Sequence, residues 1–377
     1  MTVFLFLKQI TDMLYQFHFL DYAMVVMAVV ALAYQVLLVR PQVRHHVQVA
    51  DVAILVMAGI LTASFIKDAG SNYGIYVKVL SAFLMYFVGR MYYERLQECS
   101  GALVASGYVI VYANLIHRIV LAITTKTNFF GITNAGGDFY YNDTDLVFGL
   151  LIALIFIGMY GRNSLVKIIT IFFTIPVLVL CSDAGVQKAL FIAIYILLVI
   201  YCLEKLGVPR KVSNAILVTA LAGLMAIIVM LLLPVFTGKQ NFISNLFGDG
   251  WVSYEQLASR YESWQEAWLG IRVSQPAEKL FGISLAGSFA NQYIKALSSI
   301  GVIGCLVAVI YAIDLLRRLF TIEDRKTYYI LALLAILFLG SSILNNCMEF
   351  TQCSWFVMMF GGMVVSAGKR ETEGSLD

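Results

Sequence analysis

Charged residues are scarce in this chain of 377 residues: Asp, Glu, Lys and Arg make up 13% of it, whereas 60% is hydrophobic. Soluble domains are usually about 25% charged, so this composition excludes an ordinary soluble domain. The net charge of +3 is too small to favour nucleic acid as a partner. The apolar runs approach the roughly 20 residues that a helix needs to cross a bilayer. Because they do not alternate apolar and polar residues, they also argue against a transmembrane β-barrel.

The six cysteines show no CxxC pairing, and most of them lie within or beside apolar runs. This pattern argues against a disulfide framework and against a zinc site, and we expect no cofactor. The first twenty residues lack both the basic region and the small-residue cleavage site of a signal peptide. Insertion is therefore expected to use the first true span.

Long apolar runs fill most of the chain and predict an all-α polytopic membrane protein with about eleven transmembrane helices. We expect a single membrane domain over residues 1–377 that includes one large loop, residues 238–295, between the eighth and ninth spans. The predicted spans are 21–39, 49–66, 75–89, 102–123, 146–160, 165–180, 189–203, 214–236, 296–316, 328–346 and 352–367.

Basic residues gather in alternate short loops of this pattern and predict its orientation. Fifteen lysines and arginines lie in one set of loops, and three (Lys67, Lys126 and Lys188) lie in the other. The first set is predicted to be cytoplasmic, which places the N-terminus and the long loop outside. The placement of residues 1–20 stays open, because a re-entrant or surface helix there would change the side of the membrane on which the N-terminus lies.

The long loop carries an aromatic stripe and several separated charges. Leu257, Tyr261, Trp264 and Trp268 recur at helical spacing. They predict a helix that either lies at the membrane interface with its aromatic face at headgroup depth or packs on the bundle. Five basic residues balance five acidic ones, so the loop is not a polybasic membrane clamp. We interpret it as a site with several polar roles.

Ionisable residues inside apolar runs cost about 2.5–3.5 kcal/mol each on insertion scales and mark function by default. Several polar residues of this chain converge on the predicted outer surface, the same side as the long loop. They are Asn114, His117, Arg118, Asp145, Asp183 and Lys188. The alternative for Arg118 is snorkelling to lipid phosphates, and the alternative for Asp183 and Lys188 is a simple loop ion pair.

The outer loop 124–145 combines several Phe and Tyr residues with Asp138 and Asn142. Flat aromatic faces suit sugar rings, and carboxylate and amide groups suit their hydroxyls, so this loop is a candidate for sugar binding. Loops near lipid headgroups are enriched in aromatic residues in any case, and this second interpretation stays open.

Three segments of the chain resemble the O-antigen polymerase and ligase superfamily, and most closely its polymerase (Wzy) family. The first precedes span five, the second precedes span seven, and the third is the long loop with the residues after it. They read Gly136-Gly137-Asp138-Phe139 with Asn142; Ser182 to Leu190, with Lys188 supplying the positive charge of the family's arginine; and Ser259-Arg260, Trp264, Trp268, Pro276 and Phe281-Gly282, followed by Asn291, Tyr293 and Gly301 to Gly304.

The resemblance implies a GT-C-like fold and a metal-independent glycosyltransferase in the bacterial inner membrane, with its active site facing the periplasm. Such an enzyme polymerises undecaprenyl-pyrophosphate-linked oligosaccharide repeat units into O-antigen or a related surface polysaccharide. The implied partners are the undecaprenyl-pyrophosphate-linked donor and acceptor, membrane lipids and a chain-length regulator of the Wzz type.

That reaction requires a cationic group for the leaving pyrophosphate, and arginine suits it because its guanidinium donates two parallel hydrogen bonds. Arg260 is the first candidate, followed by Arg118, Lys188 and Arg272. A carboxylate or imidazole must accept the proton of the attacking hydroxyl. The candidates for this role are Glu262, Asp145, Asp138 and His117. The other candidate substrate-binding residues are Asn142, Asp183, Trp264, Asn291 and Tyr293.

Two alternatives belong beside the polymerase. An O-antigen ligase would transfer the glycan to lipid A–core, but ligases commonly carry a histidine where this chain has Ala290. A lipid-linked glycan flippase is the alternative from another class. Transporters usually have internal repeats and broken midplane helices, whereas the predicted spans lack paired Gly or Pro interruptions and their charges gather at one surface.

Overall fold

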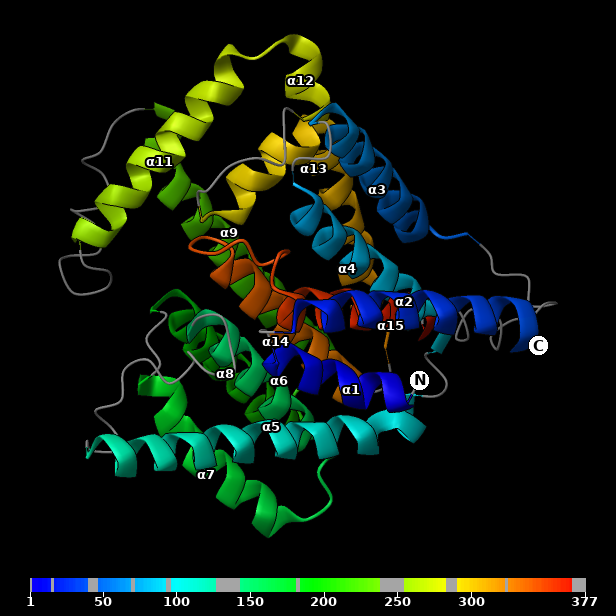
Figure 1. The fold of residues 1–377 in the computed structure, drawn as a ribbon, viewed down its shortest axis with the longest axis vertical. Coiled ribbons are helices and arrows are strands. Elements are labelled where there is room, and N and C mark those ends of the chain that lie inside the picture. The colour runs from blue at the N-terminus through cyan, green and yellow to red at the C-terminus, as the bar shows by residue number, and fades with distance from the viewer. Residues whose placement is uncertain are drawn as a thin grey trace.

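The computed structural model describes residues 2–14, 17–39, 47–68, 72–92, 96–126, 143–180, 184–237, 254–282, 290–322 and 325–367. This part of the chain consists of helices joined by short turns and contains no strands (Figure 1). The helices in chain order are α1 (Thr2–Met13), α2 (His18–Tyr34, extended by a π-turn over Gln35–Val39), α3 (Val49–Lys67), α4 (Tyr73–Tyr92), α5 (Leu96–Thr125), α6 (Asp143–Tyr160), α7 (Ser164–Leu180), α8 (Ala184–Lys205), α9 (Arg210–Thr237), α11 (Tyr254–Val273), α12 (Pro276–Phe281), α13 (Gln292–Leu319), α14 (Arg325–Ser341) and α15 (Thr351–Ala367).

Each predicted span falls on one of these helices, from α2 to α9 and from α13 to α15. Within the described residues, six helices (α2, α3, α4, α5, α9 and α13) are long and apolar enough to cross a membrane. Parts of α6, α7 and α8 are also apolar but shorter. The structure thus confirms an all-α protein with several membrane-spanning helices, while the number of eleven spans and the GT-C architecture stay predictions.

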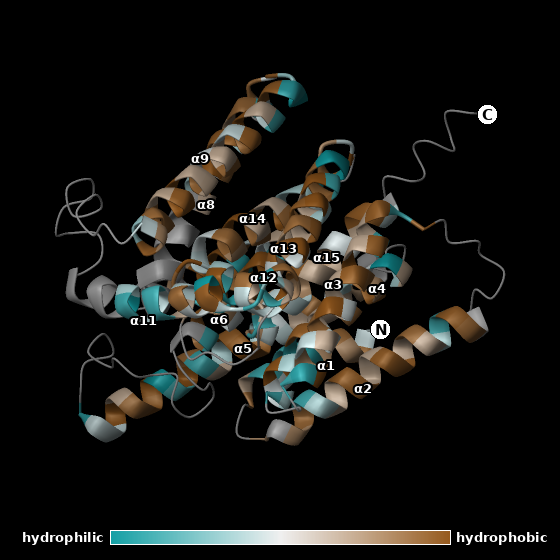
Figure 2. Ribbon diagram, turned by 90° about the horizontal axis from the view of Figure 1, so that it is seen from above, coloured by the Kyte–Doolittle hydropathy of each residue, from teal (hydrophilic) through white to brown (hydrophobic). Residues whose placement is uncertain are grey.

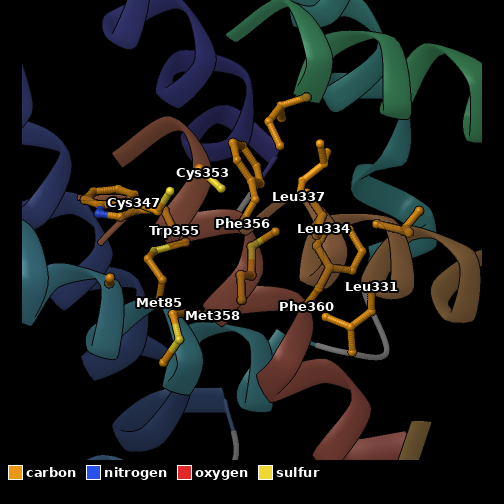
Figure 3. Close-up of a cluster of buried hydrophobic side chains, with 14 of the residues drawn as sticks. Met85, Leu331, Leu334, Leu337, Cys347, Cys353, Trp355, Phe356, Met358 and Phe360 are labelled. Atoms are coloured by element: carbon orange, nitrogen blue, oxygen red, sulfur yellow. The ribbon is translucent and has the colours of Figure 1, made fainter. Parts of the chain in front are cut away.

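The inner core is built on α6, α14 and α15, whose apolar side chains are buried on most sides. Figure 3 shows the middle of this core, where Trp355, Phe356 and Phe360 of α15 lie near Leu334 of α14 and Met85 of α4. Helices that are apolar all round suit the centre of a membrane bundle, because they have no face that needs water.

The outer helices show the opposite pattern and expose large apolar side chains. Examples are Leu55 of α3, Phe172 of α7 and Leu306 of α13. Figure 2 shows extensive brown, hydrophobic ribbon on α2 and α9, whereas α11 carries several teal stretches. Such exposed apolar surface is expected of spans that face lipid.

α4 and α15 approach each other through two glycines. A Cβ atom at Gly89 would lie 1.9 Å from the carbonyl oxygen of Met359, and one at Gly362 would lie 2.0 Å from that of Tyr86. Small residues allow this backbone contact between membrane helices, where packing replaces the hydrophobic effect as the driving force. The two glycines therefore fix the position of α15 in the bundle.

A buried ionic network joins α3, α4 and α15 at the end of the bundle where the basic loops lie. Arg90 donates from Nε to Asp51 Oδ1 at 2.9 Å and from Nη2 to Asp51 Oδ2 at 2.8 Å. Tyr86 also donates to Asp51, at 2.6 Å, and Arg90 Nη1 donates to Ser366 Oγ at 3.2 Å. This geometry satisfies the carboxylate and the guanidinium together, as a charge pair out of water requires.

α1 differs from the sequence-based prediction. It runs parallel to α5: Thr2 Oγ1 lies 3.3 Å from Cys99 Sγ, and Asn114 Nδ2 lies 4.0 Å from Met13 Sδ. The start of α1 thus lies toward the basic-loop end, which fits the re-entrant alternative left open for residues 1–20 and not an outer N-terminus. At 1.5 Å per residue its 12 residues span only about 18 Å, less than the hydrocarbon core.

α13 is broken at Gly301, whose φ of 65° and ψ of −172° lie outside the helical region. The break holds the end of α12, because a Cβ atom at Gly301 would lie 2.3 Å from the carbonyl oxygen of Leu280. Ser64 of α3 donates to the carbonyl oxygen of Ser299 at 2.8 Å, just before the break. α12 is thereby fastened to α13, which is joined in turn to α3, and α12 lies beside the end of α3 (Figure 1).

Candidate functional site

The connection between α14 and α15, residues 342–350, receives polar side chains from several parts of the chain, and we call it the α14–α15 connection. The sequence predicted a helix up to residue 346, but α14 ends at Ser341. Ser342 Oγ donates to the carbonyl oxygen of Phe338 at 2.6 Å, and the following turns leave backbone carbonyls free to accept side chains.

Asn291 joins the start of α13 to this connection. Its Nδ2 donates to the carbonyl oxygen of Ile343 at 2.9 Å, and its backbone N–H donates to Asn346 Oδ1 at 3.0 Å. Its Oδ1 accepts the N–H groups of Tyr293 and Ile294 at 3.0 and 3.1 Å, which makes it the N-cap of α13. The side chain is fully buried, so its observed role is structural, and a contact with substrate stays a prediction.

Tyr293 reinforces the same junction, because its hydroxyl donates to the carbonyl oxygen of Leu339 at 2.7 Å. Gln292 accepts the N–H of Met348 at 3.0 Å, and its own N–H donates to the carbonyl oxygen of Ser342 at 2.9 Å. The start of α13 and the α14–α15 connection therefore form one hydrogen-bonded unit.

Arg260 reaches this unit from α11. Its Nη1 donates to the carbonyl oxygen of Leu344 at 2.6 Å, and the side chain is half-buried. Within the described parts of the chain, no carboxylate forms an ion pair with Arg260 and its other guanidinium nitrogens have no hydrogen-bond partner. The guanidinium is therefore held in place without being neutralised there.

The aromatic stripe of α11 holds Arg260 in position. Trp264 is fully buried, Tyr261 donates to the carbonyl oxygen of Leu231 on α9 at 3.0 Å, and the ring of Trp268 meets Phe236 edge-on at 4.7 Å. Burial raises the pKa of Tyr261 to about 12, so the phenol remains a donor at neutral pH. The helix predicted from the stripe is confirmed, and the stripe packs on α9 instead of facing the headgroups.

A second cation, Lys295, pairs with the same α14–α15 connection that binds Arg260. Lys295 of α13 is buried and lies 3.6 Å from Glu349 of the α14–α15 connection, measured from Nζ to Oε1. Lysine and carboxylate on adjoining elements, on the same connection that binds Arg260, are groups that can hold a charged ligand and move a proton.

α1 supplies a further polar cluster at the end of the same connection. Lys8 and Asp12 form a buried ion pair, and Thr351 donates to Asp12 Oδ1 at 3.1 Å. Lys8 Nζ also lies 4.2 Å from the centroid of the Trp355 ring. A salt bridge this deep in a membrane bundle is expensive to desolvate, which makes it a candidate functional feature.

Beside Asp12 lies a small cavity with room for about one water molecule. It is lined by Gln9, Asp12, Ile110, Gly149, Ile152, Gln352 and Phe356. The two amide atoms of Gln9 are buried and have no hydrogen-bond partner among the described residues. A water in the cavity would satisfy them.

Asp145 and Arg118 are buried in the same half of the bundle. Asp145 lies in the first turn of α6, one turn before Gly149, and interacts electrostatically with Lys78, Asp12 and Lys8. Arg118 is almost completely inaccessible on α5, so it does not reach outward to lipid phosphates as a snorkelling side chain would.

The remaining predicted site residues are dispersed. Asn114 donates to the carbonyl oxygen of Ile110 at 2.8 Å, and His117 is half-buried on α5. Glu262 and Arg272 are exposed on α11. Lys188 belongs to α8, but its side chain lies outside the described structure, as do Asp138, Asn142 and Asp183 entirely.

Four residues of this site were not among the sequence-based candidates: Lys8, Asp12, Lys295 and Glu349. A signal was present for the first two, because Lys8 and Asp12 stand four apart within an apolar stretch, the spacing of a helical ion pair. Lys295 and Glu349 gave no comparable signal, since they are far apart in sequence.

The described residues contain no cluster of three or more His, Cys, Asp or Glu side chains placed to hold a metal ion. Their chemistry is that of fixed cations, buried carboxylates and amides around one connection. No family model, no curated protein and no solved structure matches this chain.

Proposed function

We propose that this protein is a membrane glycosyltransferase that polymerises oligosaccharide repeat units carried on a polyprenyl pyrophosphate, as its resemblance to O-antigen polymerases implies. The observation that supports this most is Arg260, which a backbone carbonyl orients and no described carboxylate neutralises. The leaving pyrophosphate of such a reaction needs a fixed positive charge, and a preorganised arginine supplies it without rearrangement.

Lys295 supports the same assignment from the neighbouring element. A pyrophosphate beside Arg260 would lie near the connection that also carries Glu349, the partner of Lys295. Two cations on adjoining elements suit a diphosphate better than a neutral ligand, because each can donate to a different phosphate. Arg260 would therefore bind the donor, with Lys295 beside it.

The proton of the attacking hydroxyl needs a carboxylate within reach. Asp145 remains a candidate from the sequence, and the structure adds Glu349, which lies on the same connection as the anchor of Arg260. Glu262 is exposed on α11 and fits this role less well. Loss of the base should lower the transfer rate while leaving donor binding intact.

A transporter of lipid-linked glycans is the second candidate, because the break at Gly301 is a feature that transporters use. In transporters such breaks surround a substrate, whereas here the backbone of Leu280 and Gly282 fills the break. This favours an enzyme over a transporter. The ligase alternative shares the same donor and differs in its acceptor.

The test uses the full-length protein in liposomes with a synthetic polyprenyl-pyrophosphate-linked repeat unit. A polymerase converts this single substrate into a ladder of products on a gel. A ligase leaves it unextended but transfers it to added lipid A–core. Movement of the intact substrate between leaflets, without new glycosidic bonds, would contradict the enzyme and support transport.

A further inference from the structure

We propose that the corner between α11 and α12 is a lipid-binding surface that inserts into the membrane leaflet at that end of the bundle. We define the α11–α12 corner by four exposed apolar side chains: Leu269 and Val273 of α11, and Leu280 and Phe281 of α12. Val273 is 81% exposed and Phe281 is 52% exposed. This inference does not depend on the proposed transferase activity.

One exposed stripe of α11 changes from charged to apolar along the helix. Glu262, Glu266, Leu269 and Val273 follow one another at helical spacing, and all four are exposed. The stripe covers about 16 Å at 1.5 Å per residue. Acidic residues favour water and apolar ones favour lipid, so the end of α11 is expected to lie deeper than its middle.

The corner is fastened to membrane-spanning helices. Lys67, the last residue of α3, donates to Glu278 of α12 at 2.5 Å. On the other side, a Cβ atom at Gly282 would lie 2.3 Å from the carbonyl oxygen of Ser299 in α13. α12 therefore sits at the depth at which α3 ends and α13 breaks, which is the edge of the bilayer if both helices span it.

The apolar surface continues from the corner onto those spans. Ile66 of α3 and Val302 and Leu306 of α13 are all exposed. Ile66 precedes Lys67 and Val302 follows Gly301, the residues at which α12 is attached, and Leu306 lies about one turn farther along α13. Figure 1 shows α12 above the ends of α3 and α13. A patch that merges with the surface of two spans is expected to meet the same solvent as they do, namely lipid.

The charges of the corner fit an anionic headgroup layer. Arg272 is exposed beside Val273, Lys279 lies beside Leu280, and Lys67 is half-exposed. Glu278, the acidic residue of α12, is paired with Lys67. Basic residues flanking apolar ones place their charged ends among lipid phosphates while their stems lie along the apolar layer.

The experiment measures the depth of labels along this stripe in liposomes of phosphatidylethanolamine and phosphatidylglycerol. Single cysteines replace Val273, Phe281 and, as the matched control on the same helix, Glu266. They are made in a Cys202→Ala background, because Cys202 is an exposed native thiol. Each carries an environment-sensitive fluorophore, and the labelled background protein without a new cysteine provides the blank.

We expect a nitroxide attached near the top of the lipid chains to quench the labels at 273 and 281 several-fold more than the label at 266. An aqueous quencher such as iodide should give the reverse order. Two lipid-facing positions guard against one variant failing to fold, which elution from a size-exclusion column checks. Equal quenching of all three labels by iodide, or protection of 273 and 281 from both quenchers, would overturn the proposal; the second result would indicate a protein partner on this surface.

Discussion

Arg90 shows how single residues keep charge inside this bundle. Its guanidinium binds both oxygens of Asp51, and Tyr86 donates to the same carboxylate. The pair is largely hidden from solvent, so removing either partner leaves the other as an unpaired buried charge. The stability of the basic end of the bundle therefore depends on these two residues together.

Replacing Arg90 with alanine is expected to lower the free energy of unfolding by about 3–5 kcal/mol, because Asp51 would remain as a buried charge without its cation. Equilibrium unfolding in detergent measures the change. The double variant Arg90→Ala/Asp51→Ala should lose less than the sum of the two single changes. Strict additivity would contradict a direct interaction between the two side chains.

Glu278 is the residue through which pH should act on α12. The hydrogen bond from Lys67 holds the pKa of this carboxyl below its usual range, helped by the backbone N–H of Gln275. Because the folded pKa is lowered, the stabilisation is present above the ordinary pKa of glutamate, about 4.3, and is lost as pH falls through the folded value.

We therefore expect the exchange of α12 amide hydrogens, corrected for the intrinsic pH dependence of exchange, to speed up as the pH falls from the ordinary pKa of glutamate through the lowered pKa of Glu278. Glu278→Gln should remove this pH dependence, so that the α12 amide hydrogens exchange at the faster rate at every pH. An unchanged, steep dependence in the glutamine variant would assign the effect to another group.

At the scale of elements, the close approach of α4 and α15 limits which residues can replace Gly89. A methyl group there would collide with the backbone of Met359. Gly89→Ala is expected to destabilise the protein by about 1–3 kcal/mol or more, the range for overpacked cores. Gly223→Ala is the matched control, because nothing lies within 4 Å of its Cβ position on α9.

Thermal unfolding in detergent compares the two glycine variants. Gly223→Ala should leave the midpoint unchanged or slightly raised, since alanine favours helix more than glycine does. Equal behaviour of both variants would mean that α4 and α15 do not meet as closely as the structure has them.

For the molecule as a whole, the basic loops predict which end faces the cytoplasm. A cysteine at Arg162, between α6 and α7, should be protected from an impermeant thiol reagent in right-side-out vesicles, whereas a cysteine at Glu266 on α11 should react. Inside-out vesicles should reverse this result. The opposite pattern would place the candidate site on the cytoplasmic side and contradict the predicted orientation.

The sequence could predict the helices because hydropathy is a local property: each apolar run specifies its own helix. It could not predict contacts that bring distant residues together. Thr351 binds Asp12 across 339 positions, and this partner explains how a charged α1 lies buried. The break at Gly301 likewise depends on the backbone of Leu280, and no property of α13 alone reveals it.

The candidate site was predictable in part. The resemblance pointed to Arg260 and Asn291, and the structure brings both to the α14–α15 connection. Hydropathy had assigned half of that connection to a span, so the backbone carbonyls that accept Arg260 and Asn291 there were not foreseen. Trp264 was predicted as a helical aromatic, but only packing against neighbouring helices shows that its face is buried and unavailable to lipid.

The central claim, a polymerase that clamps pyrophosphate with Arg260, is tested most directly by the product ladder of Arg260→Ala. Arg162→Ala, an exposed arginine between α6 and α7, serves as the control. We expect the alanine variant at 260 to elute as the folded protein and to extend the lipid-linked repeat unit at least about 100-fold more slowly, the usual loss when one charge-stabilising donor is removed. The control should extend it at the wild-type rate. A full ladder from a folded Arg260→Ala variant would contradict the account.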